Sequence, residues 1–298
     1  MILGRLAGRV RDRFVRLALQ SPYLAIQRAS PVAQMLLRRQ WQADLTAGRP
    51  LTSIQDAGFK AFSQTDEDGI LLYIFALIGV SKRRCVEVCA GNGIECNTAN
   101  LIVNHGWEGL LVDADARRVK EGRTFYLENP HTCVDPPVFV QAWVTRDNVN
   151  HILSANGFTG EIDLMSIDLD GMDYWIWDAI TAVAPRVVVV EYQSALGPER
   201  SVTVPYSENF DARGQHMLGK ERAFFGASLP AFVKLARKKG YRLVGCNRLG
   251  YNAFFVHESA AQPALAEWSI AQCFTRGFCV RAIRERYPAL KDMPWVEV

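Results

Sequence analysis

The sequence predicts an α/β fold: a doubly wound, mostly parallel sheet of seven strands that ends in an antiparallel hairpin, with an N-terminal helical extension. Three observations predict this fold. From about residue 60, short apolar runs alternate with amphipathic helix patterns. Several of these runs are apolar on both faces, which is typical of strands buried in a parallel sheet. The last two runs are separated only by the turn Asn247-Arg248-Leu249-Gly250, which is typical of a hairpin.

The order of the expected elements separates two kinds of nucleotide-binding fold. The expected strands are 85–89, 110–113, 138–144, 162–167, 186–192, 241–246 and 252–257. The expected helices are 94–106, 115–128, 147–156, 173–183, 228–240 and 265–282. No second nucleotide-binding half follows the fifth strand, and a hairpin closes the series instead. This layout argues against a dehydrogenase.

Length and composition are those of an ordinary globular protein that can bury a sizeable core. The chain has 298 residues, of which 49% are hydrophobic and 22% charged, and its net charge is +3. This nearly balanced charge gives no reason to expect a nucleic-acid partner. No apolar run reaches the roughly 18 residues that cross a bilayer. The seven cysteines form no CxxC pair and have no histidine at zinc-ligand spacing, so we expect reduced thiols in a cytoplasmic protein.

The chain divides into three parts. Residues 1–58 are expected to form a basic helical extension, 59–258 a Rossmann-like domain with an insert at 194–227, and 259–298 a helical tail. In the extension, apolar residues from Leu3 to Leu17 recur at steps of three or four, and the arginines lie largely off that face. The arginines also interrupt any secretory h-region. Residues 1–20 suit peripheral membrane contact, although packing against the domain or against a second copy in a homo-oligomer is the commoner arrangement.

The first strand leads into a turn of small residues, Cys89-Ala90-Gly91-Asn92-Gly93. Such a turn lets the backbone approach a nucleotide closely, with the N-terminus of the next helix aimed at the ligand. Asp113 lies 20 residues beyond Gly93, at the end of the second strand, where an acidic residue grips two ribose hydroxyls. Its alternative role is the N-cap of the following helix. Glu87, just before the turn, offers a carboxylate to a cofactor ammonium group.

Short motifs follow one another in a defined order over about residues 60–257. They are Ser63-Gln64-x-x-Glu67-Asp68-Gly69, Val86-Glu87-x-Cys89-Ala90-x-x-Gly93, Asn97-Thr98, Gly106-Trp107-x-Gly109-Leu110, Asp113, Ile167-Asp168-x-Asp170-Gly171 and Glu191. In order and spacing they resemble the FkbM-type S-adenosylmethionine-dependent methyltransferases, and the closing hairpin agrees with the class I methyltransferase layout. The resemblance implies S-adenosylmethionine as cofactor and O-methylation of a hydroxyl on a sugar, glycan or natural-product scaffold.

The resemblance also implies which residues bind the cofactor. They are Gln64, Glu87, Cys89, Ala90, Gly91, Asn92, Gly93, Asn97, Asp113 and Asp168. The chain departs from the family pattern at two positions. Cys89 stands where the family usually has glycine, which puts the shape of the cofactor turn in question, and Asp170 stands where glutamate is more usual.

Acidic residues gather at the carboxyl edge of the predicted sheet. Asp168 and Glu191 end neighbouring strands, and Asp170 follows shortly after Asp168. These carboxylates suit a general base for the acceptor hydroxyl, ligands for a divalent metal, or anchors for a sugar. We favour catalysis over a metal, because no histidine joins the cluster. Asp170 has the alternative role of a turn residue and N-cap for the helix that starts at Asp173.

The insert at 194–227 is long enough to cover a bound substrate as a lid. His216 lies within it and is a candidate general base, with a surface histidine of no special role as the alternative. Its aromatic residues Tyr206, Phe210, Phe224 and Phe225 either line a substrate site or pin the insert to the domain.

Two other functions stay open. An NAD(P)-dependent sugar-nucleotide enzyme would need a Tyr-x-x-x-Lys pair after the fourth strand, and none occurs between residues 168 and 200. A methyltransferase-like binding module is the alternative if Cys89 has abolished cofactor binding. A nucleic-acid methyltransferase is set aside, because Asp135-Pro136-Pro137 is followed by Val138 instead of an aromatic residue and precedes the third strand.

Overall fold

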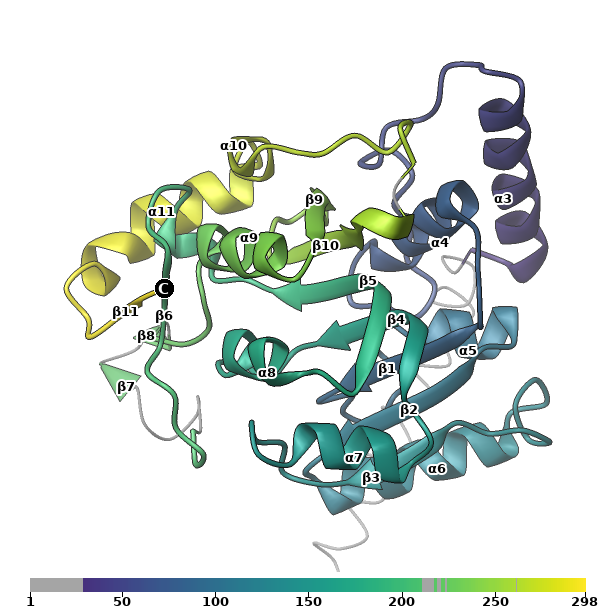
Figure 1. The fold of residues 1–298 in the computed structure, drawn as a ribbon, viewed down its shortest axis with the longest axis horizontal. Coiled ribbons are helices and arrows are strands. Elements are labelled where there is room, and N and C mark those ends of the chain that lie inside the picture. The colour runs from purple at the N-terminus through teal and green to yellow at the C-terminus, as the bar shows by residue number, and fades with distance from the viewer. Residues whose placement is uncertain (1–28, 211–216, 219–220, 223, 261) are drawn as a thin grey trace, which may run out of the picture.

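The computed structural model describes residues 29–210, 217–218, 221–222, 224–260 and 262–298, so the helix expected within residues 1–20 lies outside the described part. The centre of the fold is a seven-stranded sheet in the order β3-β2-β1-β4-β5-β10-β9, with helices around it (Figure 1). Every β1 to β5 pairing is parallel, and β10 runs antiparallel to both β5 and β9. The predicted fold class, including the edge hairpin, is confirmed.

The strands form close to their predicted positions because their apolar runs are buried on both faces. They are β1 Arg84–Val88, β2 Glu108–Asp113, β3 Val138–Gln141, β4 Gly160–Ile167, β5 Val183–Glu191, β9 Tyr241–Cys246 and β10 Asn252–His257. In β5, the four side chains of Val187, Val188, Val189 and Val190 are each at most 1% exposed. The strands β9 and β10 have the predicted bounds.

Two hydrophobic clusters cover the opposite faces of the sheet. The helices α5 Ala99–His105 and α6 Ala116–Glu128 contribute to one cluster. The helices α7 Val149–Ala155, α8 Asp173–Ala179 and α9 Leu229–Lys238 contribute to the other. These five helices match predicted ones, but α5 begins later than expected. The residues before it belong to the turn after β1.

Two further helices precede the sheet. The helix α3 Pro31–Thr46 begins after Ser30, whose hydroxyl accepts a hydrogen bond from the Ala33 N–H, and Pro31 occupies its first turn. The helix α4 Glu67–Ile78 is buried along its whole length. A helix that is buried all round has no polar face, so the sequence shows no amphipathic period there and did not predict it.

One prediction in the C-terminal tail is wrong. The single helix expected at 265–282 is two helices, α10 Ile270–Cys273 and α11 Gly277–Leu290. Between them, Arg276 has extended backbone angles (φ −80°, ψ 141°), which interrupt the helix. A short 3-10 helix, η2 Glu258–Ala260, follows β10.

The insert contacts the end of the chain. It contains the 3-10 helix η1 Ser194–Leu196 and the strands β6 Val202–Thr203, β7 Met217–Leu218 and β8 Glu221–Arg222. The strand β6 pairs antiparallel with β11 Val296–Glu297, and β7 pairs with β8. Across the described ranges, none of the helices combines the length and the apolar character needed to cross a membrane.

Candidate functional site

The turn after β1 lies where the strand order reverses. The strand β1 is flanked by β2 on one side and by β4 on the other. The chain therefore adds β2 and β3 on one side of β1, and then β4 and β5 on its other side. In doubly wound sheets, ligands bind at this switch point, outside the carboxyl ends of the strands. The geometry of residues 89–93 therefore decides what the fold can bind.

Asp113 fastens this turn to the end of β2. Its Oδ2 accepts a hydrogen bond from the Gly91 N–H at 2.8 Å, and its Oδ1 accepts one from the Asp115 N–H at 2.8 Å. A carboxylate offers about four acceptor positions, so two donors leave capacity for further hydroxyl groups. The N-cap of α6 is Asp115, which accepts from the N–H groups of Arg117 and Arg118. The capping role weighed for Asp113 therefore belongs to Asp115.

Cys89 occupies a position that suits glycine. Its φ is +67°, in the left-handed region that residues with a Cβ rarely adopt. This backbone conformation explains physically why a glycine would fit there. The Cys89 side chain itself is exposed at the rim of the turn, so it causes no steric conflict with the core.

Close packing fixes the rest of the turn. Gly93 has φ +65°, and a Cβ there would lie 2.7 Å from Leu111 Cδ1 and 2.9 Å from Phe139 Cζ. On the facing helix α6, a Cβ on Gly122 would lie 2.5 Å from the Asn92 carbonyl oxygen. Because only hydrogen fits at both glycines, helix and turn approach each other closely and the turn keeps one shape.

Glu87 lies behind the turn and holds the start of α5. Its Oε1 accepts from the Asn97 N–H at 3.0 Å and from Ser166 Oγ at 3.2 Å. Its Oε2 accepts from the Thr98 N–H at 2.8 Å and from Thr98 Oγ1 at 2.6 Å. The Asn97 amide also donates to Ser166 Oγ at 3.0 Å. Glu87 and Asn97, predicted to bind the cofactor, therefore brace the turn through a buried network.

A cavity of about 310 Å³ opens beside the turn. Its walls come from the ends of β1, β2, β3 and β4 and from the insert, and include Cys89, Asp113, Arg118, Trp143, Asp170 and Tyr206. The volume is in the range of cavities that bind small organic molecules. Among the predicted site residues, Cys89, Asp113 and Asp170 line the cavity.

The start of the insert covers one side of this cavity. Trp143 Nε1 donates a hydrogen bond to the Glu208 carbonyl oxygen at 2.6 Å. The Arg146 guanidinium lies 5.2 Å from the ring centroid of Tyr206 and 5.4 Å from that of Trp175, which are cation–π distances. These contacts tie the insert to the segment after β3 and to α8.

The aromatic residues of the insert divide between the cavity and the tail. Phe210 lines the cavity and packs against Gly171, where a Cβ would collide with its ring. Phe224 instead stacks edge-to-face on Trp295, with ring centroids 4.6 Å apart. His216, the candidate base of the insert, lies outside the described residues.

Three carboxylates meet at the ends of β4 and β5. Asp168, Asp170 and Glu191 each offer an oxygen within 4.8 Å of the others, and within the described residues this is the one group with the geometry of a metal site. Burial and the nearby carboxylates raise the pKa of Asp168 to about 8, and the same causes raise the pKa of Glu191 well above its usual value. The two carboxyls are hydrogen-bonded, with Glu191 as the donor. The pair therefore retains a proton near neutral pH.

Asp173 shapes the loop that presents Asp170. Its carboxylate accepts from the Leu169 N–H at 2.8 Å and from the Gly171 N–H at 3.0 Å. Burial raises the pKa of Asp173 to about 6. Asp170 has φ +52° and is a turn residue, as weighed, but the N-cap of α8 is Met172. The N-cap role considered for Asp170 is therefore wrong. Its exposed carboxylate lies among the other acids instead.

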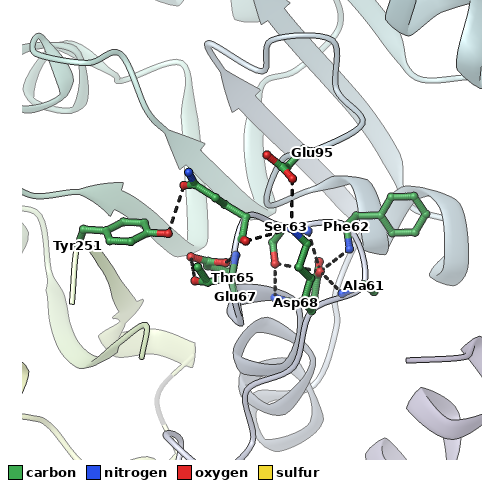
Figure 2. Close-up of polar contacts among 10 residues, drawn as sticks. Ala61, Phe62, Ser63, Thr65, Glu67, Asp68, Glu95 and Tyr251 are labelled. Atoms are coloured by element: carbon green, nitrogen blue, oxygen red, sulfur yellow. Dashed lines mark hydrogen bonds and ion pairs between the residues drawn. The ribbon is translucent and has the colours of Figure 1, made fainter. Parts of the chain in front are cut away.

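The Glu67-Asp68 pair ties α4 to the loop before it. Figure 2 shows Asp68 Oδ2 accepting from the N–H groups of Ala61, Phe62 and Ser63 at 2.6–2.7 Å, and from Ser63 Oγ at 2.9 Å. Burial raises the pKa of Asp68 to about 6. This loop therefore wraps around one buried carboxyl group.

Gln64 lies on the exposed side of the same loop. Its Oε1 accepts from the Tyr251 hydroxyl at 3.2 Å, and its carbonyl oxygen accepts from Lys60 Nζ at 3.0 Å. Lys60 also pairs with Glu95, in the loop before α5, at 3.1 Å. Gln64 thus lies near the carboxyl edge of the sheet but does not line the cavity.

Sequence reasoning missed Arg118 and Trp143, which line the cavity beside Asp113. A signal for Trp143 was available, because it follows β3 directly and the carboxyl ends of parallel strands share one edge. Arg118 is in the first turn of α6, the helix that follows Asp113. Whether Arg118 faces the cavity depends on the orientation of α6 about its own axis, and the hydrophobic periodicity of the sequence did not specify that orientation.

No protein-family model matches the chain, and no curated protein matches it. Among solved structures, it is similar to magnesium protoporphyrin IX methyltransferase from Synechocystis PCC 6803 with bound SAM (12% identity, 64% of this chain and 78% of that chain covered, TM-score 0.39). It is also similar to the glycopeptide N-methyltransferase MtfA complexed with SAM (12%, 60% and 83%, 0.36) and to PKMT2 from Rickettsia typhi (11%, 63% and 52%, 0.41). Similarities at TM-scores this low carry no conclusion about the activity of this chain.

Proposed function

We propose that this chain is an S-adenosylmethionine-dependent methyltransferase whose cofactor binds in the cavity beside residues 89–93. The observation that carries the proposal is the hydrogen bond between Asp113 and the Gly91 N–H at the switch point of the sheet. This arrangement offers a nucleoside both a close backbone approach and a carboxylate for its ribose hydroxyls. The antiparallel β10, which lies between β5 and the edge strand β9, supports a methyltransferase over a dehydrogenase.

The residues around the cavity fit the parts of this cofactor. Asp113 retains acceptor capacity for the ribose, and Trp143, which is 51% exposed, offers an aromatic surface for the adenine. The exposed carboxylate of Asp170 lines the cavity, which favours a cationic ligand group there. Bound S-adenosylmethionine supplies an electrophilic methyl group on a cationic sulfur.

For the acceptor, we propose a hydroxyl group on a sugar, glycan or natural-product scaffold, with Asp168 as the general base. The resemblance to FkbM-type methyltransferases supports the acceptor class. Asp168 would take the proton that the hydroxyl releases in those molecules in which its carboxyl is ionised, a fraction that grows as pH rises towards its pKa of about 8. Glu191 donates a hydrogen bond to Asp168 and would hold that carboxyl in place.

A divalent cation is the second candidate ligand, because the oxygens of Asp168, Asp170 and Glu191 converge within 4.8 Å. A cation needs deprotonated carboxylates, so it competes with the protons that Asp168 and Glu191 retain. If the cluster binds Mg²⁺, the stabilisation that Mg²⁺ gives against thermal unfolding should be larger above pH 8 than below it, since the pKa of Asp168 is about 8. If Mg²⁺ does not change the thermal unfolding on either side of pH 8, the cluster does not bind Mg²⁺ and the general-base role of Asp168 is the remaining candidate.

Calorimetric titration with S-adenosylhomocysteine tests the proposed cofactor. Asp113→Asn keeps an oxygen that can accept from the Gly91 N–H but removes the charge that favours ribose hydroxyls, so it should weaken binding by about tenfold. The matched control is Asp135→Asn, in the exposed loop after α6. Binding of NAD but not of S-adenosylhomocysteine would favour a sugar-nucleotide enzyme. Binding of neither would favour a methyltransferase-like module.

A further inference from the structure

One wall of the cavity belongs to the insert instead of to the sheet or its helices. Residues 206–208 and Phe210 form this wall, and the rest of the lining lies at strand ends and on α6 and α8. The cavity volume of about 310 Å³ is at the lower limit of small-molecule sites, which span about 300–1,000 Å³. A cofactor and an acceptor together need more room, so one wall has to move. The insert wall can move without breaking the central sheet, since the strands β6, β7 and β8 belong to separate small sheets.

Residues 291–298, the strap, bind the insert just before this wall. In the strap, β11 pairs antiparallel with β6, which ends three residues before Tyr206 (Figure 1). The pairing continues at Val298, whose N–H donates to the Ser201 carbonyl oxygen at 3.0 Å. Ser201 Oγ in turn donates to the Val298 carbonyl oxygen at 2.8 Å. The wall is therefore coupled to the strap through a short stretch of chain, residues 204–205.

Side-chain contacts of Trp295 and Arg200 reinforce this backbone pairing. Trp295 of the strap stacks edge-to-face on Phe224, with ring centroids 4.6 Å apart. Arg200 donates a hydrogen bond to the Lys291 carbonyl oxygen at 2.8 Å, and its Nη2 lies 3.4 Å from Glu297 Oε1. Arg200 is near the start of the insert and Phe224 is near its end. The strap therefore holds both ends of the insert.

The strap follows a helix that is itself firmly packed. In α11, the side chains of Cys279, Ala282 and Leu290 are buried. Cys279 Sγ also donates to the Gly250 carbonyl oxygen at 3.2 Å, in the turn between β9 and β10. None of residues 291–298 is buried. Detaching the strap therefore exposes little apolar core, whereas detaching α11 would expose much more, so the strap can open on its own.

We propose that the strap holds the insert against the cavity, and that ligands enter and leave the cavity when the strap detaches. The inference rests on the proposed function for the identity of those ligands. None of residues 291–298 lines the cavity, so the strap makes no contact with a ligand inside it. Its contacts therefore shift the balance between a closed and an open insert equally in the free and in the bound protein. Segments of low local stability that cover a site act as gates of this kind.

Weakening the strap should accelerate the association and the dissociation of S-adenosylhomocysteine to the same extent, because an open insert admits and releases the ligand alike. Trp295→Ala removes the stacking on Phe224, so both rate constants should rise about three- to tenfold. Arg200→Gln removes the guanidinium contacts with the strap and should raise both about two- to fivefold. The dissociation constant should change by less than about twofold in each variant. Stopped-flow mixing measures the rate constants, and calorimetry measures the dissociation constant.

A matched control separates the strap from the rest of the tail. Arg237→Gln breaks an ion pair between Arg237 of α9 and Glu267 in the tail, at 3.3 Å, and leaves the contacts of the insert intact. This variant should keep the rate constants of the wild type. Thermal unfolding shows whether each variant folds. If Trp295→Ala does not fold, Arg200→Gln carries the test, because it removes only polar contacts.

Hydrogen exchange in the unliganded full chain tests the strap without any ligand. In Trp295→Ala and Arg200→Gln, the backbone amides of residues 202–210 should exchange faster by the same factors, whereas those of β5 should not. The Val204 N–H, which donates to the Gly226 carbonyl oxygen at 3.1 Å, reports on this region. A wild-type chain that fails to bind S-adenosylhomocysteine would refute the proposed cofactor, and hydrogen exchange would still decide the strap.

Three results would overturn the inference. One is an unchanged exchange of residues 202–210 in both strap variants. Another is faster dissociation of S-adenosylhomocysteine with unchanged association, since that pattern indicates a damaged binding site instead of a loosened gate. The last is an equal effect of Arg200→Gln and Arg237→Gln on the rate constants.

Discussion

Cys89 holds a side chain in a backbone conformation that glycine adopts more readily, with φ +67°. An L residue in this region costs about 1–2 kcal/mol, whereas glycine loses about 0.5–1 kcal/mol through the entropy of the unfolded chain. Cys89→Gly should therefore raise the free energy of unfolding by up to about 1 kcal/mol, measured by urea denaturation. Cys133→Gly, which changes another exposed cysteine, should not stabilise the fold. Destabilisation by Cys89→Gly would show that the thiol itself makes a stabilising contact.

Asp168 should give the stability of the protein a pH dependence. Its pKa is raised from 3.8 to about 8, so the folded state binds this proton more tightly than the unfolded chain does. Between these two values the unfolded state has lost the proton and the folded state keeps it, so the free energy of unfolding falls as pH rises. In Asp168→Asn the fall should be smaller than in the wild type, and Asp135→Asn should behave like the wild type. Identical pH profiles for Asp168→Asn and wild type would contradict the raised pKa.

The positions of single side chains could be predicted from the sequence where those side chains stand at the ends of strands. The prediction that Asp168 and Glu191 lie together is confirmed, because adjacent parallel strands must end at the same edge. The hydrogen-bond partners of Glu87 could not be predicted in the same way, because they depend on which backbone donors surround its carboxylate. Those donors, the N–H groups of residues 97 and 98, are formed by a loop that was expected to be helix.

The helix α4 depends on one buried carboxylate at its start. Glu67 is fully buried and accepts from Thr65, from Asn247 Nδ2 at 2.9 Å and from Asn252 Nδ2 at 3.0 Å. Glu67→Ala would leave these buried amides without their acceptor, so it should lower the free energy of unfolding by about 2–4 kcal/mol. Glu95→Ala, at a side chain 62% exposed, should cost far less. Urea denaturation measures both, and equal effects would refute the role of Glu67.

Elements with a clear period were predictable from sequence, and elements without one were not. The strands β9 and β10 have their predicted bounds because a short turn separates two apolar runs. The helix α4 gave no amphipathic signal because all of its faces are buried. The break between α10 and α11 depends on the extended conformation of Arg276, a residue type that fits a helix equally well.

The insert and the segment after β3 act together across the cavity. The Trp143 Nε1 hydrogen bond to the Glu208 carbonyl oxygen, at 2.6 Å, connects them. Trp143→Phe keeps an aromatic ring but removes this donor, so S-adenosylhomocysteine should dissociate about two- to tenfold faster. Stopped-flow displacement measures the rate. An unchanged dissociation rate in this variant would show that the insert does not restrain the ligand.

At the scale of the whole molecule, the sequence predicted the sheet but not the surface that covers the cavity. The sheet follows from alternating apolar runs and turn chemistry, which are local signals. The insert instead reaches its position through contacts distant in sequence, such as the pairing of β6 with β11 and the stacking of Phe224 on Trp295. Local periodicity carries no information about such pairings.

The most direct test of the proposed cofactor site is a crystal structure of the chain in complex with S-adenosylhomocysteine. We predict that the ribose hydroxyls lie within hydrogen-bonding distance of Asp113, with the adenine beside Trp143 and the sulfur towards Asp168 and Asp170. A ligand bound outside the cavity, or with its ribose turned away from Asp113, would contradict the proposal.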